Sequence, residues 1–294
     1  MSSRSARIAL LCALGVYAGT AAGAALQDDR GVTIRADTAA RRIVTLAPHL
    51  VEIVFAAGAG DRLVGVARHS DFPREAQHIP QIGDAARVDL ERILGLQPDL
   101  VLAWRSGNPA RDVGRLEELG QRVFVTEPRR LDDIPRLLRA VGALAGSEAV
   151  AEPAALAFEA RLAKLRAAHS GRAPVRVFYE IWHRPLLTVN GKHMISDVIA
   201  LCGGANVFAT VPVLTPAVTL EAVLYARPEA ILGGSSSATP QEFVARWRNH
   251  AVEGLRNVPA FFVPPDDIQR ATPRILNGVE AICRHLDQVR TGRN

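Results

Sequence analysis

The sequence has few aromatic residues and very few cysteines. Aromatic residues make up 5% of the 294 positions, and the chain contains three tryptophans and three cysteines. Because aromatic side chains are scarce, each tryptophan is a candidate for a specific role in packing or in ligand binding. The basic residues outnumber the acidic ones by 35 to 30, but they form no run and accompany no aromatic RNA-binding signature. These absences argue against a nucleic-acid partner.

The sequence also lacks the motifs of several common enzyme classes. It contains no Walker loop, no Gly-x-Ser-x-Gly nucleophile elbow and no His-Glu-x-x-His motif, and its histidines lack zinc-ligand spacing. Gly58 and Gly60 come without the third glycine of a dinucleotide-binding fingerprint, and Gly203 and Gly204 are interpreted as a helix stop. No segment beyond the first 25 residues is long and apolar enough for us to expect a membrane span. We therefore predict a protein that catalyses no reaction and holds no resident cofactor.

The first 25 residues are predicted to be a secretory signal peptide. Arg4 and Arg7 precede a short apolar stretch that ends in small residues suited to cleavage. Cys12 lies inside this stretch without the small residues that precede a lipidated cysteine, so no lipoprotein anchor is expected. We expect a soluble, monomeric protein exported to a bacterial periplasm.

Removal of this segment leaves two cysteines, Cys202 and Cys283. An even number in an oxidising compartment favours a disulfide, and its loop of roughly 80 residues corresponds to at most about 4.5 kcal/mol in the chain-entropy model. The alternative is a pair of buried thiols. Both cysteines fall on predicted helices of the second half of the chain, so a bond would join elements within that half.

One pattern occurs twice in the same register. Starting at Leu90, the chain reads LERIL and then PDLVL; starting at Leu220, it reads LEAVL and then PEAIL. Each copy is typical of a short amphipathic helix, a proline break and a buried strand. The repeat predicts two similar lobes with Glu91 and Glu221 at equivalent positions, and two such carboxylates suit a partner that is itself two-fold. The alternative is a chance likeness, because helix-Pro-Asp-strand segments are common.

Strands and helices alternate through both halves, which is typical of mostly parallel sheets. We predict an α/β fold of two Rossmann-like lobes, at 26–146 and 171–294, joined by one long α-helix at 147–170, with a ligand cleft between the lobes. In the joining helix, the spacing of Leu156, Leu162 and Leu165 fits one face. Because a continuous helix is stiff, we expect only small lobe movements on binding.

The individual elements are predicted from local patterns. The last helix is expected to begin with Thr272 as N-cap and Pro273 at its first position. The predicted strands lie at 41–47, 62–67, 99–104, 122–126, 175–181, 229–232 and 260–263.

Two tryptophans end predicted strands, Trp104 in the first lobe and Trp182 in the second. Ligands of parallel α/β sheets lie beyond the carboxyl ends of the strands, so both indoles could face one cleft and hold a large planar ligand. The alternative is that each indole plugs the edge of its lobe. Trp247 lies four residues after Phe243 on a predicted helix and is assigned to ordinary packing.

Polar residues fall in loops at the same predicted strand ends. His69 and Asp71 could bind a metal or a polar ligand group, although a loop histidine is often merely solvated. Asp266 and Arg270 could hold amide or phosphate groups of a ligand, or form a local surface ion pair of little energetic value.

Short segments spread over nearly the whole mature chain carry a family likeness. They include RIVTLAP at 42–48 with Glu52, SDFP at 70–73, LERI at 90–93, PDLV at 98–101, AWR at 103–105, CGG at 202–204, NVF at 206–208 and ATPR at 271–274. Together they resemble the periplasmic cobalamin-binding proteins of bacterial ABC importers. The wider class of two lobes on a rigid helix also includes receptors for haem and iron-siderophores. The resemblance implies a receptor that captures cobalamin or a related corrinoid and delivers it to an ABC permease dimer in the inner membrane.

The resemblance also implies roles for individual residues. Trp104 matches a tryptophan that lines the corrinoid cleft, and Asp266 with Arg270 matches a polar pair at the edge of the ligand. Glu91 and Glu221 match the two glutamates that dock onto arginines of the two permease subunits. The two cysteines match the disulfide pair of the family.

Some positions depart from the family pattern. Ala85 and Thr215 stand where tryptophans are usual, and His69 stands where a tyrosine contacts the ligand, so the cleft has lost aromatic surface. Trp182 could replace part of it. These departures favour a corrinoid held differently, a corrinoid precursor or haem as the ligand. They also suggest that the His69 imidazole coordinates the cobalt of the ligand.

Three alternatives to a corrinoid receptor follow. The nearest is a haem or iron-siderophore receptor of the same architecture. The second is a secreted enzyme that uses the same cleft, for which the sequence offers no catalytic cluster. The third is a structural envelope protein, which would leave the paired tryptophans unexplained.

Overall fold

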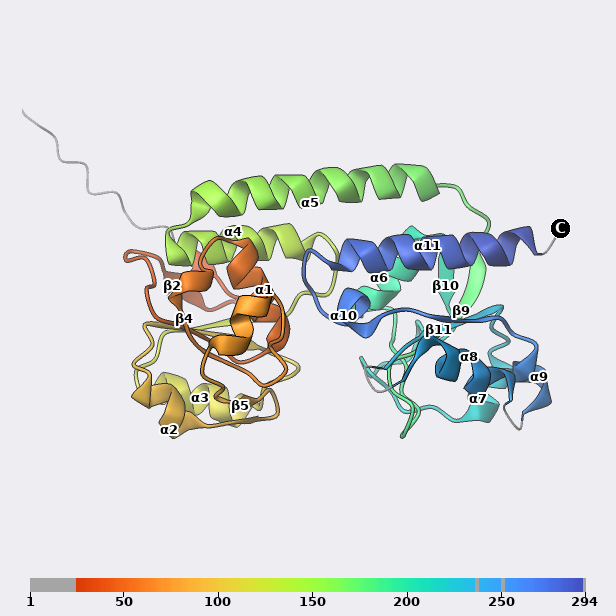
Figure 1. The fold of residues 1–294 in the computed structure, drawn as a ribbon, viewed down its shortest axis with the longest axis horizontal. Coiled ribbons are helices and arrows are strands. Elements are labelled where there is room, and N and C mark those ends of the chain that lie inside the picture. Colours follow the sequence, from red (N-terminus) through yellow and green to blue (C-terminus); the bar gives the residue numbers. More distant parts are fainter. Residues whose placement is uncertain (1–24, 236–237, 250–251, 293–294) are drawn as a thin grey trace, which may run out of the picture.

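The computed structural model describes residues 25–235, 238–249 and 252–292. The predicted signal peptide therefore lies outside the described residues, except for its last position, Ala25. The described chain forms two α/β lobes side by side, and one long helix, α5 (Glu148–His169), runs along the top of both in Figure 1. This arrangement confirms the predicted fold class.

The first lobe is built on a parallel sheet with the strand order β4-β3-β7-β8. Alternate residues of its buried strands enter two separate clusters: Leu100 and Leu102 lie in one, and Val101 and Ala103 in the other. This burial on both faces explains the continuous apolar strands of the sequence. The strands are β3 (Ile43–Thr45), β4 (Leu63–Val66), β7 (Leu100–Trp104) and β8 (Val123–Thr126). The helices are α1 (Pro48–Ala56), α2 (Leu90–Gly95), α3 (Ala110–Glu118) and α4 (Asp133–Ala145), with 3-10 turns at Gly60–Arg62 and Arg74–His78.

The second lobe repeats this plan with a parallel sheet of order β10-β9-β11-β12. Gly203 has a φ of +71° and ends α6, as predicted, but Gly204 then begins an edge strand that the sequence patterns did not indicate. The strands are β9 (Val175–Glu180), β10 (Gly204–Asn206), β11 (Ala230–Gly233) and β12 (Ala260–Phe262). The helices are α6 (Met194–Leu201), α7 (Leu220–Tyr225), α8 (Pro240–Arg248), α9 (Glu253–Arg256), α10 (Pro265–Ile268) and α11 (Ile275–Thr291).

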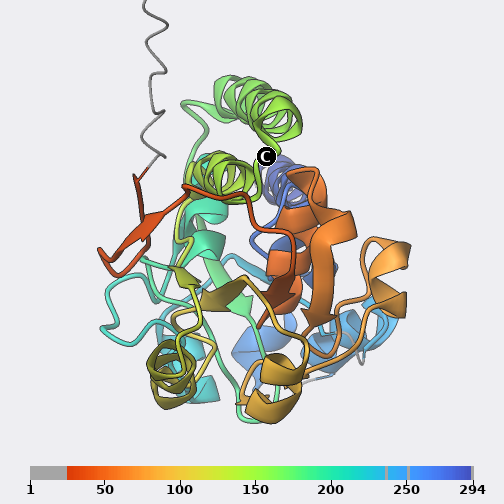
Figure 2. The same cartoon turned by 90° about the vertical axis from the view of Figure 1, so that its left-hand side faces the viewer.

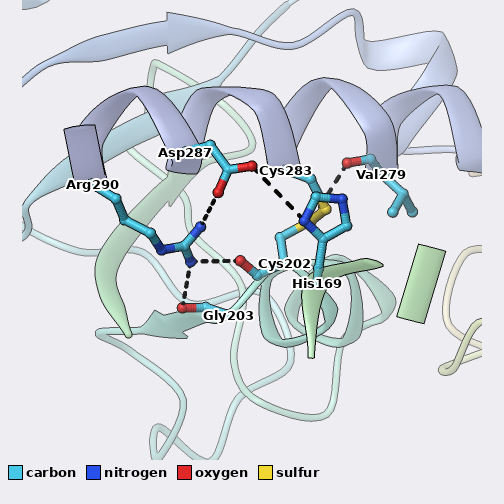
Figure 3. Close-up of a disulfide and its surroundings, with 7 residues drawn as sticks. All are labelled: His169, Cys202, Gly203, Val279, Cys283, Asp287 and Arg290. Atoms are coloured by element: carbon cyan, nitrogen blue, oxygen red, sulfur yellow. Dashed lines mark hydrogen bonds and ion pairs between the residues drawn. A yellow bond between two sulfur atoms is a disulfide. The ribbon is translucent and has the colours of Figure 1, made fainter. Parts of the chain in front are cut away.

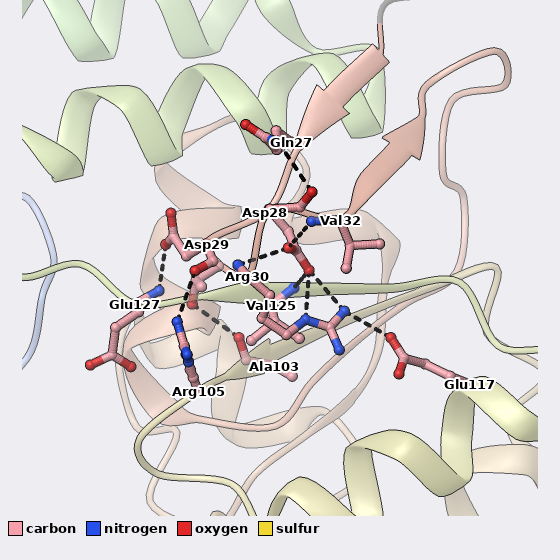
Figure 4. A network of polar contacts seen from close by, with 12 residues as sticks. Gln27, Asp28, Asp29, Arg30, Val32, Ala103, Arg105, Glu117, Val125 and Glu127 are labelled. Carbon is pink, nitrogen blue, oxygen red and sulfur yellow. Dashed lines mark hydrogen bonds and ion pairs between the residues drawn. The ribbon is translucent and has the colours of Figure 1, made fainter.

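A hairpin of two short antiparallel strands, β1 (Ala25–Gln27) and β2 (Thr33–Arg35), fastens the start of the described chain to the first lobe. The buried Asp28 carboxylate accepts hydrogen bonds from the Arg30 guanidinium at 2.8 and 2.9 Å and from the Val125 N–H at 3.3 Å (Figure 4). Burial alone would raise the pKa of Asp28, but these bonds outweigh burial and lower it. A second small pair joins β5 (Gly83–Asp84) to β6 (Arg87–Val88).

Helix α5 is tied to both lobes. Its buried face carries Ala151, Ala155, Phe158 and Leu162, which is one continuous helical stripe. The predicted face was wrong in one respect, because Leu156 is 53% exposed. Figures 1 and 2 show α4, α5 and α11 gathered on one side of the molecule.

Ion pairs reinforce both contacts of α5. Arg139 of α4 binds Glu152 and Glu159 of the helix, and Arg161 of the helix binds Glu280 of α11 at 2.7 Å. These residues are partly exposed, so each pair contributes little energy on its own. Together they hold α5 against one helix of each lobe.

Two local predictions in the second lobe were wrong. Helix α11 begins at Ile275 with Arg274 at the N-cap position, not with Thr272. Thr272 instead opens a tight turn, in which its carbonyl accepts from the Ile275 N–H at 3.0 Å, and this turn directs the Arg274 side chain towards the other lobe. Trp182 does not end a strand, because β9 stops at Glu180 and Trp182 pairs with Leu187 in an isolated bridge.

Candidate functional site

A cavity of about 620 Å³ lies between the two lobes. His69 and Trp104 of the first lobe line it, together with Trp182, Asp266 and Arg270 of the second. The structure thus brings all five predicted ligand residues to one place. That they bind a ligand stays a prediction.

Trp104 is held rigidly in the wall of the first lobe. Its backbone N–H donates to Oδ1 of the buried Asn108 at 2.6 Å, and the Asn108 amide donates in turn to the Leu46 carbonyl at 2.9 Å. The indole lies directly over Gly107, where a Cβ atom would come within 1.8 Å of the ring. The half-buried ring also makes an edge-to-face contact with His49, with the centroids 5.2 Å apart. The glycine and asparagine that follow β7 therefore orient the indole at the cavity.

Trp182 occupies the opposite wall in a different way. Its side chain is 51% exposed, and its indole N–H already donates to the Arg184 carbonyl at 2.8 Å. The polar atom of the indole is therefore satisfied within the protein, and the exposed part that remains is apolar. Such a side chain is no plug for the lobe edge.

A buried carboxylate pairs with the cavity-lining Arg270: it belongs to Glu52 of α1, whose side chain is 2% exposed. It accepts a hydrogen bond from Arg270 at 3.0 Å and two from Arg274 at 2.7 and 2.9 Å. Both arginines belong to the second lobe, so these three residues, which we call the Glu52 clamp, join the lobes across their interface. From the sequence, Glu52 was noted only as part of the family likeness, and no role was predicted for it.

Arg270 makes further contacts that alter its interpretation. One Nη group also binds Asp71 of the first lobe at 2.7 Å, and the other binds Asp266 at 3.1 Å and the His69 carbonyl at 3.3 Å. Burial lowers the pKa of Arg270, but the carboxylates of Asp71 and Glu52 outweigh burial and raise it, so the guanidinium remains charged. The sequence offered two roles for Arg270, ligand binding or a local surface ion pair with Asp266. Neither describes this arrangement, because Arg270 bridges the lobes as well as lining the cavity.

Three histidines line the cavity, of which the sequence singled out one. His69 is exposed and has a φ of +67°, a conformation that histidine adopts more readily than most residues. His49 is buried beside Trp104, and burial with the nearby Arg270 lowers its pKa to about 4. His193 precedes α6, and its pKa is likewise lowered to about 4 by burial and by Arg129. His49 and His193, which the sequence did not single out, each lie at the N-terminus of a helix that follows a predicted strand. That position was the available signal, because the carboxyl ends of the strands face the cleft.

The helices that carry Glu91 and Glu221 are built alike. Asp89 caps α2 by accepting from the Arg92 N–H at 3.0 Å, and Thr219 caps α7 by accepting from the Ala222 N–H at 3.2 Å. Each glutamate is the second residue of its helix and is exposed. Figures 1 and 2 show both helices at the side of the molecule away from α5.

The other ends of these two helices also match. Arg42, just before β3, donates to the Leu96 and Gln97 carbonyls after α2. Arg176, near the start of β9, donates to the Ala226 and Arg227 carbonyls after α7. In both lobes the residue after the proline, Asp99 or Glu229, donates its backbone N–H to the carbonyl of that arginine. A chance likeness of short patterns would not reproduce these contacts, so Glu91 and Glu221 occupy equivalent places, while their docking role stays a prediction.

The predicted disulfide between Cys202 and Cys283 is confirmed. The sulfurs are 2.01 Å apart, and both residues are buried where the end of α6 meets α11 (Figure 3). Next to it, Arg290 of α11 donates to the carbonyls of Cys202 and Gly203 at 2.7 and 3.1 Å. The bond therefore joins two elements of the second lobe, and the alternative of two buried thiols was wrong.

In residues 25–235, 238–249 and 252–292, no group of three His, Cys, Asp or Glu side chains is placed to hold a metal ion. None of the helices in these same ranges has both the length and the apolarity needed to cross a membrane.

A family model described as periplasmic binding protein matches residues 43–260 of the chain. The chain belongs to the periplasmic binding protein family. This periplasmic binding protein is 35% identical over 252 residues to the vitamin B12-binding protein of Vibrio parahaemolyticus, covering 86% of this chain and 91% of that one.

Solved structures agree with this assignment. The periplasmic vitamin B12 binding protein BtuF of Vibrio cholerae matches with a TM-score of 0.79 and 34% identity, over 85% of this chain and 98% of that one. The periplasmic heme-binding protein RhuT from Roseiflexus matches with a TM-score of 0.73 over 85% and 98% of the two chains. Its identity of 23% shows a shared fold only.

Proposed function

We propose that this binding protein captures cobalamin or a related corrinoid between its lobes and delivers it to an ABC transporter of the inner membrane. The observation that carries the proposal is the 35% identity to a vitamin B12-binding protein over nearly the full length of both chains. The cavity supports it, because two indoles from opposite lobes offer apolar surface to a broad planar ligand. The family is one of solute carriers, so the protein binds its ligand without converting it and needs no resident cofactor.

In this proposal, Trp104 and Trp182 contact the corrin faces or edges, and Asp266 with Arg270 contacts polar groups at the ligand periphery. Arg270 already has carboxylate partners at both Nη groups, so it contributes a fixed positive charge more than free donors. The ligand is transported as cargo. The protein acts as a monomer in the periplasm after an N-terminal signal peptide has been removed.

The permease contacts are proposed for Glu91 and Glu221. Their equivalent positions on α2 and α7 support a partner with two equivalent subunits. Exposed ion pairs contribute about 0–1 kcal/mol each, so these residues would set orientation and encounter rate more than affinity.

Isothermal titration of the purified mature protein with cyanocobalamin, haemin and a ferric siderophore tests the proposal. We expect saturable binding of cyanocobalamin and none of the other two at the same concentrations. Tight binding of haemin with no response to cyanocobalamin would overturn it.

A haem receptor is the second candidate, and the observation that favours it is the set of three histidines at the cavity. Imidazole is a common axial ligand of haem iron. Under this candidate, haemin titration would produce the Soret and visible bands of a histidine-ligated haem, which cobalamin binding does not.

We also propose that His69 coordinates the metal of the ligand. Its exposed side chain lines the cavity, and imidazole suits cobalt as well as iron. Replacing His69 with alanine should change the visible spectrum of bound cobalamin. An identical spectrum for the wild-type and His69→Ala complexes would contradict coordination.

A further inference from the structure

His193 caps α6 in an unusual way. It precedes the first residue of the helix with an extended backbone, and its Nδ1 accepts a hydrogen bond from the Ile195 N–H at 3.2 Å. Asparagine, aspartate and serine are the residues that usually fill this position, because a short side chain suffices. The imidazole performs the same capping and adds a second nitrogen at the far end of the ring.

The capping bond determines which ring nitrogen carries the hydrogen. Because Nδ1 of His193 is an acceptor, it has no hydrogen, and the neutral ring must carry its hydrogen on Nε2. Burial and the charge of Arg129 lower the pKa of His193 to about 4, so this neutral tautomer persists at neutral pH. The ring is therefore a fixed hydrogen-bond donor at Nε2.

This donor lies at the interlobe cavity. His193 is partly exposed there, on the same cavity as Trp104 and Trp182. Its Nδ1 edge is turned back to α6, and because the side chain lines the cavity, the opposite Nε2 edge is the one available to a ligand there. Within the part of the chain that the structure describes, no hydrogen bond involves this nitrogen. A donor fixed in orientation and without a protein partner suits an oxygen acceptor on the ligand.

We propose that His193 donates a hydrogen bond from Nε2 to an amide carbonyl or phosphate oxygen at the edge of the bound corrinoid. This inference rests on the proposed function and adds a binding residue to it. The capping role and the binding role use different nitrogens, so the two can be separated by mutation.

His193→Asn is the decisive variant, because asparagine keeps an acceptor for the helix N-terminus and removes the Nε2 donor. We expect thermal unfolding like that of the wild type and an affinity for cyanocobalamin reduced by about 3- to 10-fold, as for the loss of one hydrogen bond. His78→Asn, at an exposed histidine of the 3-10 turn Arg74–His78, is the matched control and should leave affinity unchanged. His193→Ala should lower both the affinity and the unfolding temperature.

Dicyanocobinamide, which has the corrin amides but lacks the phosphate-bearing nucleotide, separates the two acceptors. A loss of affinity for both ligands supports an amide acceptor, and a loss for cyanocobalamin alone supports the phosphate. Unchanged affinity of His193→Asn for both ligands, with a wild-type protein that binds them, would overturn the inference but leave the proposed function standing. A wild-type protein that binds neither ligand would overturn both.

A second measurement avoids dependence on the folding of the variant. In ¹⁵N-histidine-labelled wild-type protein, we expect the neutral tautomer with hydrogen on Nε2, and we expect its Nε2 resonance to shift when cyanocobalamin is added. A protonated Nδ1 in the free protein, or an Nε2 resonance that ligand addition does not move, would refute the role of His193.

Discussion

Replacing Glu52 with glutamine would show how strongly the Glu52 clamp stabilises the closed arrangement of the lobes. Glutamine keeps the size of the side chain and removes its charge. Arg270 would retain Asp71 and Asp266 as partners. Arg274 has no other ion pair among the described residues, so it would keep its contact over the Phe72 ring and, at most, a neutral hydrogen bond to the glutamine carbonyl oxygen.

The expected cost follows from burial. The carboxylate of Glu52 is 2% exposed, and the side chains of Arg270 and Arg274 are 15% and 23% exposed. Removing one partner from a buried ion pair costs about 3–5 kcal/mol, because the opposite charge is left without compensation. The charges that remain beside Arg270 place the expected loss near the lower end, at about 3 kcal/mol. With an unfolding entropy of about 2.1 cal/mol/K per residue, that corresponds to a decrease of about 5 °C in the melting temperature of a chain of this size.

Circular dichroism at 222 nm during heating measures this loss, with Glu280→Gln as the matched control. Glu280 also pairs with an arginine of another element, Arg161, but the two side chains are 40% and 41% exposed. The control should therefore lose at most about 1 kcal/mol. If Glu52→Gln melted at the same temperature as Glu280→Gln, the clamp would contribute no more than a surface ion pair, and the reasoning from burial would be refuted.

Three further predictions concern the cavity and the docking helices. Trp182→Ala should weaken cyanocobalamin binding roughly 30-fold, as measured by calorimetry. A ligand that covers roughly 80 Å² of the exposed indole gains about 2 kcal/mol at about 25 cal/mol per Å². An unchanged affinity would place the ligand elsewhere. His49 and His193, with pKa values of about 4, stay neutral in the folded state while the unfolded state binds protons below about pH 6.5. The contribution of the two histidines to the free energy of unfolding is therefore present above pH 6.5 and falls towards pH 4, by at most about 2.5 kcal/mol per histidine at pH 4.5. Urea unfolding midpoints measured at about pH 6.5 and pH 4.5 check this. Equal midpoints at the two pH values would mean that the rings are already protonated in the folded state. The double variant Glu91→Ala/Glu221→Ala should keep its cyanocobalamin affinity but stimulate ATP hydrolysis by the reconstituted transporter less than the wild type, and equal stimulation would contradict docking through these residues.

Features that depend on short-range patterns could be predicted from the sequence. The repeat around Glu91 and Glu221 indicated two similar lobes, because the amphipathic helix, the proline and the buried strand each have a local signature. The structure adds long-range contacts, which have no local signature in the sequence. The arginines at 42 and 176 that pin the ends of α2 and α7 lie about 50 residues from their partners, so pattern reading did not pair them.

The Glu52 clamp lay beyond sequence reasoning for the same physical reason. Its partners, Arg270 and Arg274, follow Glu52 by more than 200 positions, and an ion pair depends on distance in space. The one local indication was a carboxylate among the buried apolar residues of α1, which requires a charged partner. The misplaced start of α11 belongs to the same feature, since the turn from Thr272 that displaces the helix start also delivers Arg274 to Glu52.

The clamp and the connection through α5 together constrain how a ligand can enter. A second crossing links the Asp197 carboxylate of α6 to the Leu131 N–H of the first lobe at 2.9 Å. Opening the lobes widely would break this bond and expose the Glu52 carboxylate, at a cost of several kcal/mol that ligand binding would have to repay. We therefore infer that a planar ligand slides between Trp104 and Trp182 with little lobe movement. On this inference, small-angle scattering profiles of the free and loaded protein should nearly coincide, whereas a large decrease in the radius of gyration on loading would mean that the clamp is open in the free state.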